Sequence, residues 1–341
     1  MFEVTPVETR LHDLARRHDV AMPRFDVRTW LAPDLAALDA AIEAVGQDQS
    51  GTAWAAVRHL LERPGKRLRP LCVLLAARLG GPGEAPRASE VRDLALACEL
   101  AHGSTLLHDD VIDQADIRRG APAARAIYGN AISVLAGDHL LITALRLVRG
   151  DLRDTFLSMV SELVEAEVAQ LERRGRFVAD RGAWIATARG KTASLFRFCL
   201  WGGGMLAGQP EAVVAGLARL GEAIGVAFQM VDDVLDLEGD PAVTGKEIGV
   251  DLREGKLTWP LILAAERDPA FADRLAAVAR GTGEDVADLV SHVARLGALS
   301  QARADARQHA EMARDLLGML PAGPAREGLG ELVDALARRC A

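Results

Sequence analysis

The stretch Leu106–Gly120 reads LLHDDVIDQADIRRG and decides how the rest of the chain is interpreted. An apolar run leads into it, which predicts a buried helix with an acidic end. Asp109 and Asp113 are four residues apart, so they share a face of that helix one turn apart. Two carboxylates this close repel each other unless a cation lies between them, and hard oxygen ligands favour magnesium over zinc. The same spacing returns later in the chain, in Asp232, Asp233 and Asp236.

Composition limits the classes of protein that fit. The chain has 341 residues, half of them hydrophobic, which is enough for a sizeable core in one large domain over 1–341. A net charge of −8 argues against a general nucleic-acid binder. The charged N-terminus lacks a signal-like apolar core, and no apolar run approaches the ~20 residues of a membrane span, so none is expected. The four cysteines are scattered singly, which fits a reducing cytoplasm.

Apolar residues recur at helical spacing along most of the chain, and no strand-like alternation extends beyond a few residues. The sequence therefore predicts an all-α bundle of roughly ten or more helices around a central cavity, with 1–31 as a peripheral N-terminal segment. Segment 239–258 holds four glycines and a proline and is expected to form a lid loop. Thr258 can cap a helix that opens at Trp259. The longest helical runs are expected at 131–148, 151–171, 183–207 and 210–238.

Both acidic patches have basic neighbours. Carboxylates, magnesium and arginine together suit a phosphorylated ligand, because metals bridge phosphate oxygens and arginine pairs with them bidentately. The helices that lead into both patches are apolar, so a ligand with a phosphate head and a hydrocarbon tail would satisfy both halves. The basic residues are Lys66, Arg67, Arg69, Arg118 and Arg119 near the first patch, and Lys191, Lys246, Arg253 and Lys256 near the second.

Across roughly residues 50–270 the chain resembles the all-trans polyprenyl (isoprenyl) diphosphate synthase family. The motifs are GKRLRP at 65–70, HGSTLLHDDVID at 102–113, RRG at 118–120, GKT at 190–192, FQMVDDVLD at 228–236, GK at 245–246 and DLREGK at 251–256. The resemblance implies the type I isoprenoid synthase fold and a homodimer. It also implies a prenyltransferase that condenses isopentenyl diphosphate head-to-tail with an allylic diphosphate.

The resemblance assigns a role to each motif residue. The expected catalytic set is Asp109, Asp110, Asp113, Asp232, Asp233, Asp236 and Lys191, in which Asp109, Asp113 and Asp232 would bind three magnesium ions with help from the other aspartates. The allylic diphosphate would be held by Arg118, Lys191, Thr192, Gln229, Lys246 and Lys256. Isopentenyl diphosphate would be held by Lys66, Arg69, His102 and Arg119. The implied reaction is ionisation of the allylic diphosphate, attack by the isopentenyl double bond, and loss of a proton to the released diphosphate.

Product length depends in this family on the residues just before the first aspartate motif. Thr105, Asp109 and Asp113 form one helical stripe, so Thr105 lies about one turn below Asp109. Bulky aromatics at this position and the one before it stop growth at fifteen carbons in the family, whereas Ser104 and Thr105 are small. We therefore expect a product longer than farnesyl, C20 or above and of the C30–C50 class.

Other activities fit parts of the pattern. A geranylgeranyl or farnesyl diphosphate synthase would share these motifs. A class I terpene cyclase usually carries an Asn/Ser/Glu triad in place of the second aspartate motif, and a non-catalytic subunit of a heteromeric synthase could lose aspartates that this chain keeps. His108-Asp109 resembles the HD doublet of metal-dependent phosphohydrolases. A nucleotide P-loop at the GKT triplet fails because position 185 is Ile, not glycine.

Overall fold

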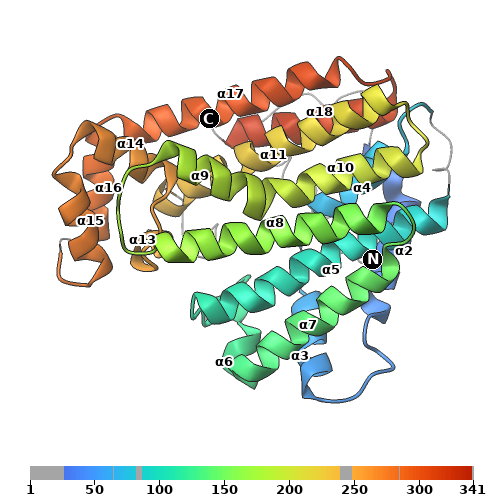
Figure 1. The fold of residues 1–341 in the computed structure, drawn as a ribbon, viewed down its shortest axis with the longest axis horizontal. Helices are drawn as coiled ribbons and strands as arrows, with labels where there is room; N and C mark the ends of the chain where they lie inside the picture. Colours follow the sequence, from blue (N-terminus) through green and yellow to red (C-terminus); the bar gives the residue numbers. More distant parts are fainter. Residues whose placement is uncertain (1–26, 64, 82–86, 239–247, 284, 340–341) are drawn as a thin grey trace, which may run out of the picture. The chain divides into compact units, whose positions relative to one another are not determined.

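The computed structural model describes residues 27–63, 65–81, 87–238, 248–283 and 285–339, with only the backbone of Arg28. Within them the chain is almost entirely helical, as the sequence predicts, and its only strands, β1 (Ile117–Arg118) and β2 (Ala121–Pro122), pair antiparallel (Figure 1). The helices are α2 (Val27–Ala44), α3 (Thr52–Leu61), α4 (Leu68–Ala77), α5 (Ala88–Ile112), α6 (Ala124–Tyr128), α7 (Asn130–Leu147), α8 (Leu152–Arg173), α9 (Arg181–Ala188), the π-helix η1 (Arg189–Ala193), α10 (Ser194–Leu206), α11 (Glu211–Glu238), α13 (Val250–Arg253), α14 (Trp259–Arg267), α15 (Phe271–Ala279), α16 (Val286–Arg295), α17 (Ala298–Leu317) and α18 (Pro324–Arg339).

The chain divides into two compact units. The first unit consists of Met1–Phe156, Cys199–Leu217 and Leu320–Glu331, and the second of Leu157–Phe198, Ala218–Met319 and Leu332–Ala341. Four helices, α8, α10, α11 and α18, contribute residues to both units. The prediction of one domain around a central cavity stays a prediction.

Helix α5 lies at the centre of the first unit. It packs against α4 and α7, and its Leu100 and Leu107 are fully buried, as is Leu140 of α7. A Cβ atom on Gly103 would lie 3.0 Å from Cδ1 of Leu140, so the glycine lets α5 and α7 approach closely. This packing fixes the helix that carries the first acidic motif.

Glycines also allow helices to pack closely in the second unit. The helical run predicted at 183–207 is present, but its residues 189–193 form the π-helix η1, which the sequence pattern did not predict. A Cβ atom on Gly190 would lie 2.6 Å from Cβ of Ala166, so η1 packs tightly on α8. A Cβ atom on Gly225 of α11 would lie 2.3 Å from Cα of Ala193. Short π-helical segments are frequent at functional sites.

Three features differ from the sequence-based prediction. Residues 27–31 belong to α2, whose Leu31 is fully buried, so the peripheral segment does not extend to residue 31; residues 1–26 lie outside the described ones. The lid segment is not a continuous loop, because residues 250–253 form α13, while 239–247 also lie outside the described part. Thr258 precedes α14, but its hydroxyl makes no cap bond; the first N–H, that of Trp259, bonds to Asp233 instead.

Helix α11 is long and apolar enough to cross a membrane by length and composition alone. More than half of its most apolar window is buried inside the structure, and core helices of proteins that never enter a bilayer pass the same test.

Candidate active site

The first acidic motif occupies the C-terminal end of α5. The N–H of Asp113 donates to the carbonyl of Asp109 at 2.8 Å, which confirms that these carboxylates lie one turn apart, and both are half-buried. Asp110 is only 1% exposed and accepts hydrogen bonds from Nε of Arg118 at 2.7 Å and from its Nη2 at 2.5 Å. Burial raises the pKa of Asp110, and Arg118 opposes that rise.

A tight hairpin after α5 directs the two adjacent arginines. Arg118 pairs with Ala121, so Arg119 and Gly120 form a two-residue turn, and both have positive φ (53° and 73°). Positive φ at both central residues is the geometry of a type I′ turn, which suits the twist of paired strands. The turn separates the two side chains: Arg118 reaches Asp110, whereas Arg119 reaches a pocket on α5.

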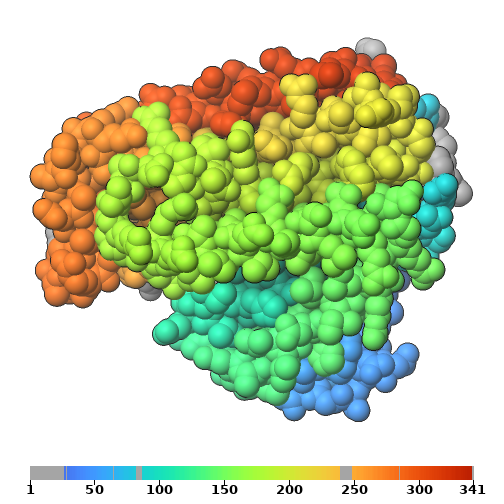
Figure 2. Space-filling view, in the orientation of Figure 1, coloured from blue at the N-terminus to red at the C-terminus, as the bar shows by residue number. Residues whose placement is uncertain are grey.

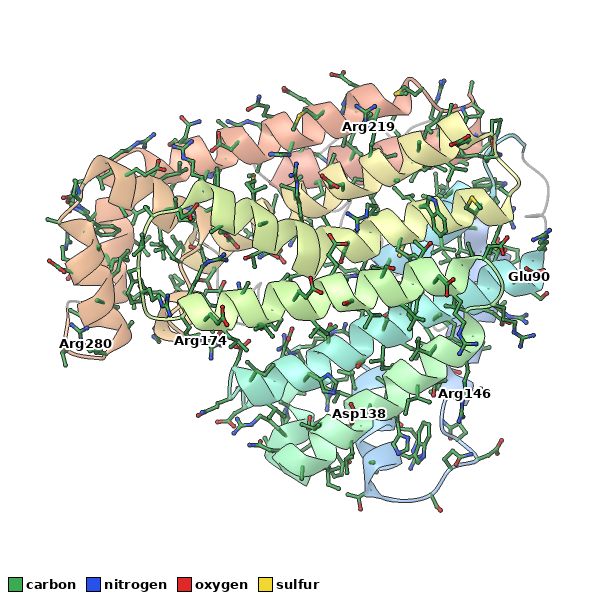
Figure 3. All side chains as sticks on the ribbon, in the orientation of Figure 1. Glu90, Asp138, Arg146, Arg174, Arg219 and Arg280 are labelled. Atoms are coloured by element: carbon green, nitrogen blue, oxygen red, sulfur yellow. The ribbon has the colours of Figure 1, made fainter. Side chains whose placement is uncertain are left out.

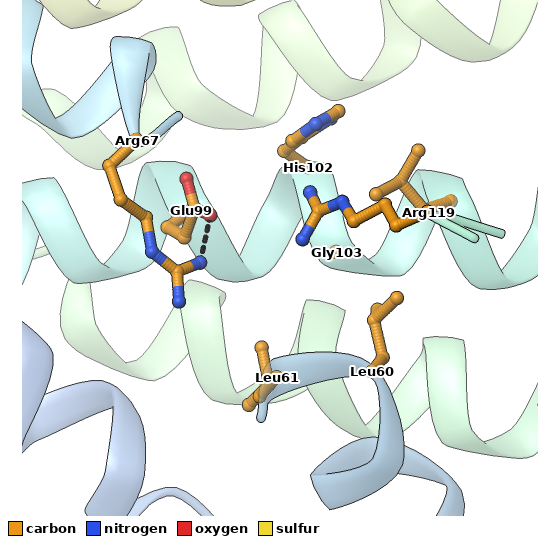
Figure 4. A pocket seen from close by; sticks show the side chains of 8 residues that line it. Leu60, Leu61, Arg67, Glu99, His102, Gly103 and Arg119 are labelled. Carbon is orange, nitrogen blue, oxygen red and sulfur yellow. Dashed lines mark hydrogen bonds and ion pairs between the residues drawn. The ribbon is translucent and has the colours of Figure 1, made fainter. Parts of the chain in front are cut away.

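A small pocket in the first unit contains several charged side chains. Its lining consists of Leu60, Leu61, Arg67, Glu99, His102, Gly103, Leu106 and Arg119 (Figure 4). Arg67 forms an ion pair with Glu99, and Nη1 of Arg119 donates to the carbonyl of Arg63 at 3.3 Å. A Cβ atom on Gly65 would lie 3.1 Å from the same Nη1, so only a glycine lets Arg119 lie against this loop without displacement.

The pocket is electrostatically positive. Burial lowers the pKa of His102 well below its ordinary value, and the charges of Arg69, Arg119, Arg118 and Arg67 lower it further. The imidazole is therefore neutral near pH 7 and can serve as a hydrogen-bond partner rather than as a charge. Four guanidinium groups near one imidazole suit an anionic ligand such as a phosphate or diphosphate.

The structure brings together most of the residues expected to hold isopentenyl diphosphate. His102 and Arg119 line the pocket, and Arg69 is close enough to act on His102. The exposed Lys66 is the chain neighbour of Gly65, against which Arg119 lies. The sequence pattern gave no role to the Arg67–Glu99 pair, because its two residues lie 32 positions apart.

His108 has a different role from the neighbouring aspartates. Its Nε2 lies 3.1 Å from the carbonyl of Val134 and 3.4 Å from Asp138, both on α7. A Cβ atom on Gly137 would lie 2.2 Å from the same nitrogen, so the ring fills the space that this glycine leaves. His108 thus packs α5 against α7, which weighs against the HD phosphohydrolase interpretation.

In the second unit the GKT motif forms most of η1. Lys191 donates to Oε1 of Gln170 at 3.1 Å and forms an ion pair with Glu167, both on α8. Thr192 donates from Oγ1 to Oε1 of Gln229 at 2.7 Å. Three of the residues expected at the allylic diphosphate are thus held by η1 and α11.

Asp233 of the second acidic motif is 2% exposed and accepts three hydrogen bonds. Its Oδ1 accepts from Nε2 of Gln229 at 2.9 Å, and its Oδ2 accepts from Nε1 of Trp184 and from the N–H of Trp259, both at 2.8 Å. Burial, with the nearby charge of Asp251, raises the pKa of Asp233 to about 8, and the three donors oppose that rise.

Asp236, the last residue of this motif, lies beside α13. Asp232 and Asp236 are half-buried one turn apart on α11, and Oδ1 of Asp236 lies 3.4 Å from the N–H of Asp251. Lys256 forms an ion pair with Glu254 at 2.7 Å and lies 3.9 Å from Asp251. Lys246, expected at the allylic diphosphate, lies outside the described residues.

Each acidic motif offers two carboxylates to a divalent cation. Among the described residues, no group of three or more acidic, histidine or cysteine side chains forms a complete metal site. Asp109 with Asp113 and Asp232 with Asp236 each provide hard oxygen donors one helical turn apart. Magnesium usually takes one or two carboxylates and completes its shell with water and substrate phosphates. The donor set therefore fits magnesium.

Comparison with known proteins identifies the family of this chain. A family model described as polyprenyl synthetase matches residues 52–296. The nonaprenyl diphosphate synthase of Mycobacterium tuberculosis is 36% identical over 81% of this chain and 83% of its own length. Heptaprenyl diphosphate synthase component 2 of Geobacillus stearothermophilus is 34% identical over 91% of this chain and 97% of its own.

Among solved structures, polyprenyl synthase from Caulobacter crescentus CB15, complexed with calcium and isoprenyl diphosphate, superposes with a TM-score of 0.85 at 34% identity. The match covers 93% of this chain and 100% of that one, and the shared architecture is the all-α type I isoprenoid synthase fold. The chain belongs to the polyprenyl synthetase family and is a prenyltransferase.

Proposed function

We propose that this chain is a magnesium-dependent all-trans polyprenyl diphosphate synthase that makes a C30–C50 product. Helix α5 carries the observation that supports this most directly. Its His102 borders the cation-lined pocket, and Asp109 follows two turns later on the same helix, roughly 10 Å along its axis. One helix therefore presents a pocket for a diphosphate and an acidic end for a metal, as a condensation of two diphosphate substrates requires.

The pocket in the first unit would hold isopentenyl diphosphate. Lys66, Arg69 and Arg119 supply positive charge, and the neutral His102 supplies a hydrogen bond. Binding the diphosphate at several points fixes the isopentenyl double bond, which converts its attack into an effectively unimolecular step.

The allylic diphosphate would be held by Arg118, Lys191, Thr192, Gln229, Lys246 and Lys256. Asp109, Asp113 and Asp232 would hold magnesium, three ions in all, and the metal would supply Lewis-acid stabilisation of the negative charge on the leaving diphosphate. The lysines and Arg118 add fixed positive charge to the same oxygens. The released diphosphate accepts the proton lost from the condensed product. Segment 239–258 would cover the site and exclude water, which would otherwise trap the allylic cation.

Small residues on α5 support a long product. Ser104 is buried, and Thr105 donates from Oγ1 to the carbonyl of His102 at 2.8 Å, so its hydroxyl folds back along the helix. Neither side chain supplies the aromatic bulk that stops growth at fifteen carbons. The relatives named for nonaprenyl and heptaprenyl diphosphate agree with a long product. A geranylgeranyl or farnesyl product is the alternative within the same reaction.

A second candidate function is the role of one subunit in a heteromeric synthase. One relative carries the name component 2 of a heptaprenyl diphosphate synthase. The chain keeps all six motif aspartates, so as such a subunit it would be the catalytic one.

A homodimer is the proposed assembly, and α7 supports it. This helix lies at the surface in the space-filling view (Figure 2), and it carries the exposed Asp138 and Arg146 (Figure 3). Its Val134, Leu135 and Ile142 are exposed as well. Exposed apolar side chains gathered on one helix are typical of a protein interface, and a second copy of this chain is the expected partner. Sedimentation of the purified chain tests this: Leu135→Glu should convert a dimer into a monomer, and a wild-type monomer would refute it.

The function is tested by incubating the purified chain with magnesium, isopentenyl diphosphate and each allylic primer from C10 to C20. Dephosphorylated products are sized by mass spectrometry, and C30–C50 prenols are expected. Products of C15 or C20 only would replace the length proposal by the shorter alternative. No product from any primer would favour the subunit interpretation, which addition of a cell extract would then test by restored turnover.

A further inference from the structure

One carboxylate of the second acidic motif is committed to contacts with the protein. The three donors to Asp233 come from three different helices: Gln229 on α11, Trp184 on α9 and Trp259 on α14. A carboxylate has roughly four acceptor positions, and three of them are filled here at 2.8–2.9 Å. With 2% exposure, Asp233 is oriented into the packing between these helices.

One of these hydrogen bonds connects Asp233 to residues that are proposed to bind the allylic diphosphate. The amide of Gln229 donates from Nε2 to Asp233 and accepts at Oε1 from Thr192, so its orientation is fixed at both ends. Without an acceptor at position 233 the amide could turn over, and Thr192 would then face an N–H group instead of a carbonyl oxygen. The chain Thr192–Gln229–Asp233 therefore sets which atoms of η1 and α11 are presented to a ligand.

A second bond anchors the segment that follows the lid. Trp259 is the first residue of α14 and comes three residues after Lys256, and its N–H is one of the orphan donors of a helix start. Asp233 supplies the cap that Thr258 does not. The Trp259 ring lies 4.8 Å from that of Trp184, and its Nε1 donates to Asp305 at 2.8 Å. These contacts fix both tryptophans in place beside the carboxylate of Asp233.

We propose that Asp233 is a positioning residue for the allylic diphosphate rather than a metal ligand. It orients Gln229 and, through it, Thr192, and it fixes the start of α14 behind Lys256. The proposal rests on the proposed synthase function, which the wild-type assay tests separately. The first aspartate of the doublet, Asp232, keeps its role at the metal.

The experiment compares Asp233→Asn with Asp232→Asn. Asn keeps the shape of the side chain but presents an NH₂ group to one of the three donors. A hydrogen bond to a charged acceptor favours the bonded arrangement by about a factor of ten or more, here the arrangement in which Gln229 presents Oε1 to Thr192. Asp233→Asn should therefore raise KM for the allylic primer about tenfold, and leave both KM for isopentenyl diphosphate and the magnesium concentration for half-maximal rate unchanged. Asp232→Asn should shift the magnesium requirement.

Binding without turnover gives an independent readout. A non-ionising allylic thiodiphosphate, titrated by calorimetry in magnesium, should bind Asp233→Asn about tenfold more weakly than the wild type. In a Gln229→Ala background, Asp233→Asn should weaken binding by a smaller factor than in the wild type, because the route through that amide is already lost and only the route through α14 remains.

Two tryptophan variants complete the test. Trp184→Phe removes one donor from Asp233 and should weaken allylic binding by a smaller factor. Trp54→Phe is the matched control: Trp54 stacks on His139 in the first unit, and its loss should leave allylic binding unchanged.

An equal magnesium shift in Asp233→Asn and Asp232→Asn would make Asp233 a ligand and overturn the proposal. An equal rise of both KM values would make its role merely structural, with the same result. If Asp233→Asn does not fold, unchanged allylic binding in Trp184→Phe overturns the proposal. Wild-type protein without turnover on any primer refutes the proposed function itself.

Discussion

A glycine contact between α11 and η1 leads to a prediction about both stability and activity. Gly225 of α11 faces η1, where a Cβ atom would lie 2.3 Å from Cα and 2.5 Å from Cβ of Ala193. Carbon atoms in contact normally lie about 3.5–4.0 Å apart, so Gly225→Ala must push α11 away from η1 by roughly 1 Å or more. Ala193 Cα is a backbone atom and cannot rotate out of the way.

Two opposing terms set the size of the effect. Replacing a helical glycine by alanine gains about 1 kcal/mol of helix propensity. Overpacking a core costs about 1–3 kcal/mol, and contact with backbone places this site at the upper end. The net loss is therefore about 2 kcal/mol, or a Tm lower by about 4 °C for a chain of this size.

Gly216→Ala is the matched control on the same helix. A Cβ atom there would meet only Cδ2 of Leu320 at 3.9 Å, an ordinary contact. This variant keeps the propensity gain without the clash, so its Tm should rise by about 2 °C. Differential scanning fluorimetry of both variants measures the difference.

The contact between Gly225 and Ala193 should also affect binding of the allylic primer. Gln229 lies one turn after Gly225, and its 2.7 Å hydrogen bond with Thr192 crosses the surface that the added methyl would open. KM for the allylic primer should therefore rise in Gly225→Ala and not in Gly216→Ala. Equal Tm shifts in the two variants, or an unchanged allylic KM in Gly225→Ala, would refute this account of the helix contact.

Four further predictions concern the first unit. Thr105→Phe should shorten the product, measured by mass spectrometry of the prenols; unchanged length would refute the proposal that the small Ser104 and Thr105 permit a long product. Asp109→Ala should abolish condensation while circular dichroism shows an intact fold, and retained turnover would remove its metal role. Because the pKa of His102 is lowered, the unfolded chain binds a proton below about pH 6.5 that the folded chain does not. Folded stability should thus fall as pH drops below that value, less steeply in His102→Gln, and equal slopes in chemical denaturation would contradict this. Gly120→Ala meets nothing within 4 Å but has φ +73°, so it should cost about 1 kcal/mol and raise KM for isopentenyl diphosphate by displacing the hairpin, which steady-state kinetics measures.

Helical periodicity and motif order made much of the fold predictable. The runs expected at 131–148, 151–171 and 210–238 correspond closely to α7, α8 and α11. Helical periodicity depends only on which residues are apolar, and the sequence specifies this directly. The π-helix could not be predicted in this way, because it shifts the hydrogen-bond pattern without changing the apolar pattern. Its close packing on α8 and α11 becomes visible only in three dimensions.

The charged pocket shows a similar limit. Its cations were identified by residue type and motif, but the ion pair of Arg67 with Glu99 joins residues 32 apart in the chain. The turn that separates Arg118 from Arg119 requires positive φ at an arginine, which is uncommon for a residue other than glycine. Sequence spacing alone gives no reason to expect adjacent arginines to serve different partners.

The two aspartate doublets obey one physical rule. Successive residues of an α-helix are rotated by about 100°, so neighbours in a doublet cannot share a face. Asp110 falls on the buried stripe of Leu100 and Leu107, and the second doublet places Asp233 on the buried stripe of Met230 and Leu237.

Each buried second aspartate then needs donors, because an unpaired buried carboxylate is costly. Arg118 in β1 meets Asp110, and the start of α14 meets Asp233, so each doublet fixes the segment that follows it in the chain. Asp109 and Asp232 are half-buried on a different face, where the proposed site has them bind magnesium. In the proposed site each doublet would thus supply one metal ligand and one anchor, a division that follows from helical geometry in both motifs.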